Sequence, residues 1–535
     1  MLPNAAPQQM TEVLVQKPHA PAAAYGAAPA IKPAPCTVLS LYTALLLSAC
    51  AVGPNFTPPA PVAAPAATAQ SAAKVLTSSG RIDAPWWRSF GDNALNELEE
   101  RVLAGNLDLA EAGARIGRAR AALRIAGASG LPRAGAAASY MRERASPEGI
   151  LSLIGDGSPA PDSAGGAAPF GTTTLEPSDK SGDYDLFQAG FDASWELDFW
   201  GKARRTREAS RSEAQAAFLD REAARISLSA EVARTYMRLR GAEARLIILR
   251  SNRQAVVAGQ RIADERQRRG AATRYDAATA GTQVAAIDAE LPAVERDAAV
   301  ARNALASLAG AEPHALDSLL AGETGAMPAV GGSMPSALPS DLARSRPDIL
   351  AAESALHAAT ARIGMAKADF YPSVSLSGSF GLQSLALNDL PSWGARQFVV
   401  GPILHLPIFE GGQIKGRLEL AQADQQVAAI RYRATVLRAW HEIDDALEEL
   451  RTSNARLKAA EAGVEQSRIA AHVSERRYHA GASGYLDVLV AERARLEREG
   501  TWVTARADHA IALTALYKAL GGGWTPPTTP KVAGS

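Results

Sequence analysis

The stretch that decides the fold is FQAGFDASWELDFWGK, residues Phe187 to Lys202. Its apolar members are Phe187, Ala189, Phe191, Ala193, Trp195 and Leu197, and polar or small residues stand between them. This period-2 alternation is typical of a β-strand with two different faces. At Gly201 the alternation stops and a long stretch rich in Ala, Arg and Glu begins. The sequence therefore predicts a strand that runs directly into a helix.

The same event occurs again further along the chain. Alternation from Phe398 to Ile408 ends before Gly412, where a second long helical stretch begins. Phe398 stands 211 positions after Phe187, and Gly412 stands 211 positions after Gly201. The equal spacing, without gaps, indicates an internal duplication of a strand-into-helix unit.

Each copy of the unit is predicted to contain a long helical hairpin. The expected helices cover 202–268, 273–308, 413–478 and 485–519, with further strands around 134–141 and 374–382. Turns at 269–273 and 480–484 join the helices of each pair. Val436, Trp440 and Ile443 begin a run with the alternating four- and three-residue spacing of a coiled coil, so they are expected to be packing residues.

Composition excludes several classes of protein. The 535 residues are 47% apolar and 21% charged, which is ordinary for a globular chain. Lys and Arg number 56 and Asp and Glu number 56, so the balance gives no sign of nucleic-acid binding. Cys36 and Cys50 are the two cysteines, which excludes a disulfide framework. The body has no apolar run long enough for a transmembrane helix.

The N-terminal region has the features of an export signal. The apolar run 37–49 suits the core of a signal peptide, and Leu47-Ser48-Ala49-Cys50 resembles the bacterial lipobox. That resemblance implies cleavage before Cys50 and attachment of a lipid to its sulfur. The alternative is a cysteine that follows a hydrophobic signal by chance. Residues 1–49 are thus expected to be a disordered leader and signal peptide, and 50–84 a lipid-anchored extended linker.

The rest of the chain divides at its Pro- and Gly-rich segments. The expected parts are a first repeat at 85–310, a linker at 311–341, a second repeat at 342–520 and a disordered tail at 521–535. Each repeat would contain helices, a β-hairpin and a coiled-coil hairpin.

The strands have the length of transmembrane β-strands. Four strands cannot close a barrel, and an open edge in a bilayer leaves backbone groups unpaired. Three copies would supply twelve strands, so a homotrimer is expected. Trp195, Phe199 and Trp200 stand at the helix-proximal end of the strand, where aromatic residues suit a membrane interface. The alternative is a half-buried sheet within one soluble chain.

No catalytic or metal-binding pattern is found. The eight His residues are scattered, and His441-Glu442 is not followed by a second His at metalloprotease spacing. No Gly-rich phosphate loop follows a strand. We therefore expect neither an enzyme nor a cofactor.

Several motifs together resemble the outer-membrane factors, the TolC-like exit ducts of efflux and secretion systems, and above all their lipoprotein branch in multidrug efflux. They are LSACAVGPNFTPP (47–59), WWRSFGDNALNELEERVLAGNLDLAEAGARI (86–116), SWELDFWGKAR (194–204), RSRPDILAAESALHAATARIGMAKADFYPSVSL (344–376) and RRYHAGASGYLDVL (476–489). The resemblance implies a mainly α-helical fold with membrane β-strands: coiled-coil hairpins that form a periplasmic α-barrel, and four strands per chain that close as a twelve-stranded barrel in a homotrimer.

The same resemblance implies a passive exit duct in the outer membrane of a Gram-negative bacterium. Its partners would be a periplasmic adaptor and an inner-membrane transporter of the RND type. The alternative is a periplasmic adaptor or structural coiled-coil lipoprotein without a pore. Adaptors, however, carry one hairpin, whereas this chain repeats hairpin and strands twice.

The resemblance also implies roles for residues at the hairpin turns. Acidic residues at the position of Asp487, and at its repeat counterpart Asp276, would line a periplasmic gate. The alternative is that each carboxylate compensates the dipole at a helix N-terminus. The turns would dock the adaptor, and the residues concerned are Gly270, Thr273, Tyr478, Gly481 and Ser483. For Gly270 and Gly481 the alternative is that they simply terminate helices.

Overall fold

A computed structural model of the chain describes residues 51–60, 85–144, 183–321, 327–328 and 346–524. Residues 1–50 form one unit of the chain and 51–535 a second, to which all the described residues belong. The predicted leader, Cys50, most of the 50–84 linker and most of the tail lie outside the described residues. Within the described part, no helix has the length and apolar character needed to cross a membrane.

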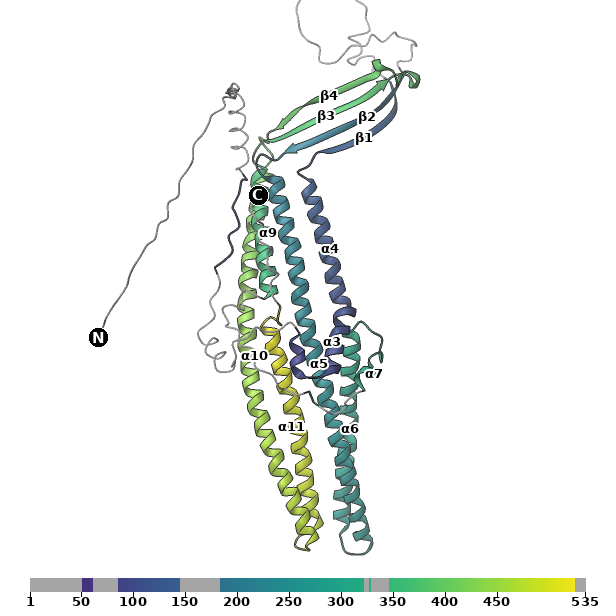
Figure 1. The fold of residues 1–535 in the computed structure, drawn as a ribbon, viewed down its shortest axis with the longest axis vertical. Helices are drawn as coiled ribbons and strands as arrows, with labels where there is room; N and C mark the ends of the chain where they lie inside the picture. Colours follow the sequence, from purple (N-terminus) through teal and green to yellow (C-terminus); the bar gives the residue numbers. More distant parts are fainter. Residues whose placement is uncertain (1–50, 61–84, 145–182, 322–326, 329–345, 525–535) are drawn as a thin grey trace, which may run out of the picture. The chain divides into compact units, whose positions relative to one another are not determined.

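The long helices and the strands occur in two sets, and the second set repeats the order of the first (Figure 1). The first set comprises α3 (Asn93–Gly105), α4 (Leu107–Ala128), β1 (Arg133–Arg144), β2 (Asp183–Leu197), α5 (Lys202–Arg268) and α6 (Arg274–Leu308). The second comprises α9 (Pro347–Ala368), β3 (Ser373–Ser384), β4 (Arg396–His405), α10 (Gln413–His479) and α11 (Tyr485–Ala519). Short helical pieces are η1 (Trp86–Phe90), η3 (Leu387–Asp389), η4 (Trp393–Ala395) and α7 (Asp317–Leu320).

The duplication read from the sequence is confirmed by the helix lengths. Both α5 and α10 have 67 residues, and both α6 and α11 have 35. At 1.5 Å per residue the longer helices extend about 100 Å. Gly201 and Gly412 precede α5 and α10 with positive φ angles of 80° and 87°, a conformation that glycine adopts without steric cost. The strand therefore turns into the helix at a glycine in both copies.

The four strands form one antiparallel sheet in the order β1-β2-β3-β4. Its register brings the apolar positions of neighbouring strands onto one face: Phe191 of β2 pairs with Phe380 of β3, which pairs with Phe398 of β4. On the opposite face, Ser194 of β2 pairs with Ser377 of β3. Cross-strand pairing thus turns the period-2 pattern into a sheet with one apolar face and one largely polar face.

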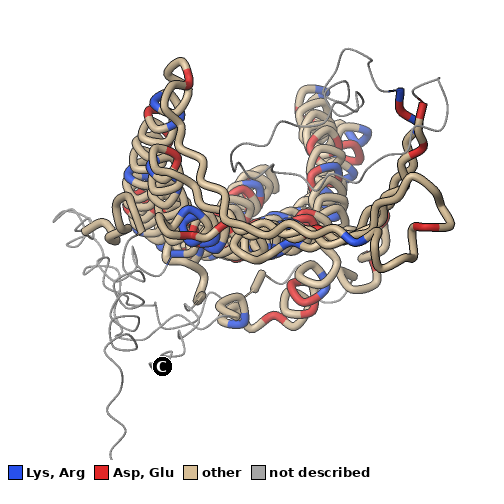
Figure 2. The backbone as a smooth tube through the Cα atoms, turned by 90° about the horizontal axis from the view of Figure 1, so that it is seen from above, with Lys and Arg blue, Asp and Glu red and all other residues tan. Residues whose placement is uncertain are grey.

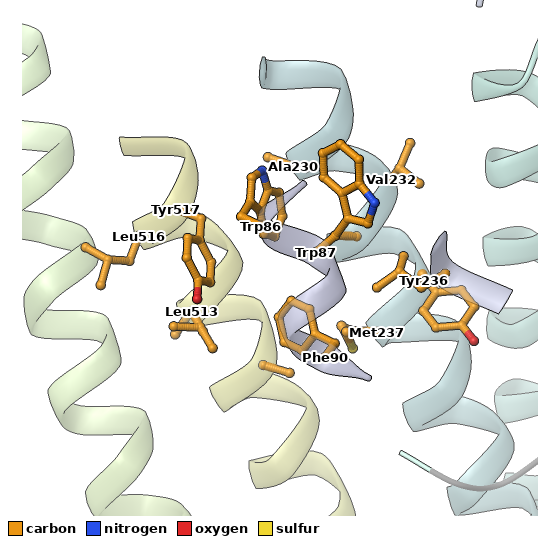
Figure 3. Close-up of a cluster of buried hydrophobic side chains, with 14 of the residues drawn as sticks. Trp86, Trp87, Phe90, Ala230, Val232, Tyr236, Met237, Leu513, Leu516 and Tyr517 are labelled. Carbon is orange, nitrogen blue, oxygen red and sulfur yellow. The ribbon is translucent and has the colours of Figure 1, made fainter. Parts of the chain in front are cut away.

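The helices pack around a core between the two hairpins (Figure 3). The 3-10 helix η1 inserts Trp86, Trp87 and Phe90 between α5 and α11, and all three side chains are buried. The Trp86 ring stacks on Tyr517 of α11 with centroids 4.9 Å apart. In α10 the predicted coiled-coil residues Val436, Trp440, Ile443, Leu447 and Leu450 are at most 4% exposed, which confirms their packing role.

Two boundaries differ from those expected. Alternation extends to Ile408 in the sequence, but β4 ends at His405. Pro407 has no backbone N–H to donate to a sheet, and this explains the earlier end. The segment expected as a linker after residue 311 contains α7, and its Leu320 is 1% exposed in the helical core.

Candidate functional site

The two hairpin turns are built alike, and they lie at the end of the helices away from the sheet (Figure 1). Gly270 ends α5 with a φ of 73° and Gly481 ends α10 with a φ of 72°. The N–H groups of Ala271 and Ala482 both donate back to helix carbonyls, those of Arg266 and Arg477, at 2.8 Å. Each turn is therefore closed by the same backbone bonds, and both glycines do terminate helices.

Asp276 and Thr273 cap the N-terminus of α6 together. Asp276 Oδ2 accepts hydrogen bonds from the Thr273 backbone N–H at 2.9 Å and from the Thr273 hydroxyl at 2.7 Å. The Asp276 N–H donates to Thr273 Oγ1 at 3.2 Å. These hydrogen bonds lower the pKa of Asp276, because they favour the charged carboxylate. The helix-end role considered for Asp276 is thus present, and its side chain is exposed at the turn.

Asp487 occupies the matching position in α11, but its partner differs. The N-cap is Gly484, whose N–H donates to Asp487 Oδ2 at 3.2 Å. Ser483 precedes this cap, and its hydroxyl is buried without a hydrogen-bond partner among the described residues. Glycine supplies no side-chain acceptor, so this helix end is capped less completely than that of α6.

Tyr478 connects the ends of the two hairpins. Its hydroxyl accepts a hydrogen bond from Arg266 Nη2 of α5 at 3.5 Å. Its ring meets that of Tyr485 edge to face, with centroids 5.2 Å apart. Burial, followed by the influence of Tyr478, raises the pKa of Tyr485. Sequence reasoning placed Tyr478 at the turn but gave no sign of its contact with the other hairpin.

The aromatic residues at the strand-to-helix junction are tied to the neighbouring elements. Trp195 Nε1 donates to the carbonyl of Gly130 at 3.0 Å, just before β1. Trp200 Nε1 donates to the carbonyl of Pro372 at 2.7 Å, just before β3. Trp200 also stacks on Tyr371 with centroids 4.6 Å apart. Phe199 lies between them in the chain and is half-buried.

Charge is distributed unevenly between strands and helices (Figure 2). Lys, Arg, Asp and Glu are interspersed along the helices, whereas β3 has none. At the end of β1 and β2 away from the helices, Arg142 and Arg144 lie within 4 Å of Asp183, whereas Arg133, Asp192 and Glu196 stand nearer the helices. The exposed residues Phe191, Phe380 and Phe398 lie between the ion pairs of Asp183 and the junction aromatics, as a membrane-spanning band requires.

A groove between the hairpins was not foreseen from the sequence. It measures about 590 Å³ and lies between α5, α6 and α11. Its apolar lining includes Leu249, Ile287 and Leu496, and Arg245 and Glu290 form an ion pair beside it at 2.5 Å. The contributing segments are far apart in sequence, so no local pattern could have indicated it. Across the described ranges, no group of His, Cys, Asp and Glu is arranged to hold a metal ion.

Comparison with known proteins relates this architecture to characterised channels. The family model described as outer membrane efflux protein matches residues 98–311 and 338–522, close to the two predicted repeats. Outer membrane protein OprJ of Pseudomonas aeruginosa is 33% identical over 489 residues, which span 91% of this chain and 96% of OprJ.

Solved structures agree with this result. The outer-membrane channel OprN is similar with a TM-score of 0.77 at 32% identity, covering 89% of this chain and all of that chain. The open state of the MtrE outer membrane channel of Neisseria gonorrhoeae gives a TM-score of 0.72 at 29% identity, covering 89% of this chain and 98% of that chain. These similarities confirm the predicted TolC-like fold and give no support to an adaptor without a pore. The chain belongs to the outer membrane efflux protein family and is an outer-membrane efflux channel of a Gram-negative bacterium.

Proposed function

We propose that the chain works as a homotrimer, in which three four-stranded sheets close one barrel and the hairpins of three copies enclose the duct. The sheet itself carries this proposal. In the described part of the chain, β1 and β4 each pair with one strand, so both outer edges are free. An unpaired edge costs several kcal/mol per backbone group within a bilayer. Pairing of β4 with β1 of the next copy would remove both edges.

The partners in this proposal are a periplasmic adaptor at the hairpin turns and an inner-membrane RND-type transporter that supplies the cargo. The turn residues Gly270, Thr273, Tyr478, Gly481 and Ser483 would receive the adaptor. Small residues in both turns support close approach, because Cβ atoms at Gly270 and Gly481 would meet nothing within 4 Å. Tyr478 would add an aromatic contact beside this surface.

The same turns would form the periplasmic gate, with Asp487 and Asp276 as its charged residues. Both side chains are exposed one turn into their helices, where threefold symmetry would bring copies of one carboxylate together. Such a ring attracts cations. The capping hydrogen bonds of both residues are compatible with this role, since both side chains stay exposed at the turns while they accept them.

At the other end of the helices, Cys50 would carry the lipid anchor in the outer membrane. Trp195, Phe199 and Trp200 would mark the periplasmic interface of the bilayer. Their place at the end of β2, next to the exposed apolar face of the sheet, supports this assignment.

The trimer is tested by two measurements on the full-length protein from outer-membrane fractions. We expect a trimer that migrates as a monomer only after heating in detergent, and we expect the unheated form to open pores in planar lipid bilayers. A monomer at every temperature, or a trimer without conductance, would contradict the proposal.

A further inference from the structure

The segment directly after Cys50 is held against the helices by three different contacts. The Val52 N–H donates to the carbonyl of Trp200 at 3.0 Å. Asn55 Oδ1 accepts a hydrogen bond from Arg205 Nη2 of α5 at 2.7 Å. The Phe56 ring stacks on His357 of α9, with centroids 4.3 Å apart and planes 9° from parallel. Backbone, polar and aromatic contacts thus fix residues 52–56 to the strand-to-helix junction and to two helices that lie far apart in the sequence.

The receiving surface is held in place by its own contacts. Arg205 is 5% exposed, and its Nη1 pairs with Glu208 at 2.7 Å. Glu208 also contacts His357 Nε2 at 2.8 Å, so one carboxylate positions both the guanidinium and the ring. Arg205 and His357 are therefore already oriented for Asn55 and Phe56.

Glycines make the close approach sterically feasible. Gly53 has a φ of 103°, and a Cβ atom there would lie 2.5 Å from the Cα of Gly364. Gly364 lies inside α9, where glycine is less favourable than alanine. A Cβ at Gly364 would in turn lie 2.9 Å from Arg205 Cγ. The absence of a side chain at Gly364 therefore leaves room for both the N-terminal segment and Arg205 at the surface of α9.

We propose that residues 52–60 act as a clamp, anchored by Asn55 on α5 and by Phe56 on α9, which holds the lipid-bearing end of the chain at the strand-to-helix junction. Ala51 reaches this junction directly, since a Cβ at Gly201 would lie 2.8 Å from Ala51 Cα. Ala51 is the single residue between the clamp and position 50 in the sequence.

The clamp allows the lipid-anchored end less movement than a flexible linker would. A linker would let the lipid-anchored end move over a range of heights, whereas the clamp fixes that end beside Trp200. The apolar band of the sheet would then enter the bilayer at a defined depth. The role in lipid positioning rests on the proposed acylation of Cys50, but the docking of residues 52–60 does not.

Two matched insertions test the positioning role. A flexible Gly/Ser stretch of about ten residues is placed either after Ala51 or after Ala60 in the full-length chain. The first separates the lipid from the clamp, and the second leaves both joined. We expect the first insertion to lower the amount of heat-modifiable trimer in the outer membrane several-fold, and the second to leave it unchanged. Equal amounts from the two variants, high or low, would overturn the positioning role.

A photo-crosslinking amino acid of aromatic size at position 56 tests the docking itself. We expect crosslinks to peptides of α5 and α9 in the same chain. Gly364→Ala should displace Arg205 and reduce the yield of these crosslinks several-fold. Gly117→Ala is the matched control, because nothing lies within 4 Å of a Cβ at Gly117. Crosslinks elsewhere, or an equal response to both substitutions, would overturn the docking. Pore formation by the purified wild-type trimer is measured in parallel. Absence of pores would show that the channel proposal fails, whatever the result for the clamp.

Discussion

Gly259 of α5 receives the side chain of Leu489 of α11: a Cβ atom at residue 259 would lie 2.7 Å from Leu489 Cδ2. Gly259 is buried, and Leu489 follows Asp487 by two residues. The two hairpins are therefore in close contact near the turns, beside the residues proposed to line the gate. Arg266 and Tyr478 add a second link between the same hairpins.

Gly259→Val is expected to force α5 and α11 apart near the turns. A single methyl could be absorbed by rotation of Leu489, but the branched side chain cannot be placed without moving a helix. Single-channel conductance of the trimer in planar bilayers should therefore increase. Gly416→Val is the control, since a Cβ at Gly416 meets nothing within 4 Å. Unchanged conductance of an intact Gly259→Val trimer would show that this contact does not hold the duct narrow.

Asp487→Ala should also raise single-channel conductance. The substitution removes the charge proposed to ring the constriction and the acceptor for the Gly484 N–H, which loosens the start of α11. Conductance and cation selectivity are measured together on the purified trimer. A variant that matches the wild-type protein in both would leave Asp487 with a helix-capping role alone.

Ser483→Phe should abolish efflux while the trimer remains intact. Ser483 is half-buried just before the Gly484 cap and its hydroxyl is buried, so a large ring does not fit in its place and must alter the surface of the turn that would meet the adaptor. Ser483 is preferable to Gly481 for this test, because the φ of 72° at Gly481 would strain any other residue. Drug susceptibility of cells that carry the adaptor and transporter provides the measurement. Glu475→Phe, on the exposed surface of α10, is the control, and normal efflux by Ser483→Phe would contradict docking at this turn.

The element boundaries could be predicted because they depend on local signals. The change from period 2 to a helical pattern at Gly201, and its repetition at Gly412, located α5 and α10 to within a residue of their observed bounds. The hairpin turns followed from Gly270 and Gly481. Such positions are determined by neighbours in the sequence, so the chain alone reveals them.

The contacts between elements could not be predicted in the same way. Phe56 meets His357, and Arg266 meets Tyr478, across hundreds of residues with no periodic pattern to connect them. The N-terminal cap of α11 is another contact that could not be predicted from the sequence. Thr273 is a recognisable capping residue, but its counterpart Gly484 has no side chain, and the hydrogen bond to Asp487 comes from its backbone.

Glu99 of α3 should make the stability of the helical region depend on pH. The residue is fully buried, and its carboxylate oxygens have no hydrogen-bond partner among the described residues. Burial raises the pKa of Glu99 well above its usual value of 4.5, with Ser229 and Arg225 opposing this rise. The folded state therefore binds a proton that the unfolded chain releases. Its stabilising contribution is complete below pH 4.5 and is lost as pH rises through the folded-state pKa.

Glu99→Gln removes this proton equilibrium, so the variant should lose part of the pH dependence. Thermal unfolding followed by far-UV circular dichroism between about pH 5 and pH 8 measures the difference. Glu97→Gln, at an exposed position of the same helix, is the control. If the unfolding temperatures of wild type and Glu99→Gln change in parallel with pH, Glu99 does not titrate within this range.

Arg240→Ala is expected to destabilise the helical core more than any surface charge substitution. Arg240 is 1% exposed, and it donates to the Tyr236 hydroxyl at 2.9 Å, to Glu243 at 2.8 Å and to the Leu320 carbonyl at 3.2 Å. Removing one partner of a buried ion pair costs about 3–5 kcal/mol, because the remaining charge stays buried. Glu243 keeps a contact with Arg302 at 2.6 Å, so the loss should be near the lower end of that range.

The loss is measured as a reduced free energy of unfolding in denaturant, with Arg296→Ala as the control. Arg296 is 70% exposed and pairs with its neighbour Asp297, so its removal should change stability by less than about 1 kcal/mol. Comparable effects of the two substitutions would show that the Arg240 network does not stabilise the core. A large effect of Arg240→Ala alone would instead show that α7, through the Leu320 carbonyl, and α5 are stabilised by one buried cation.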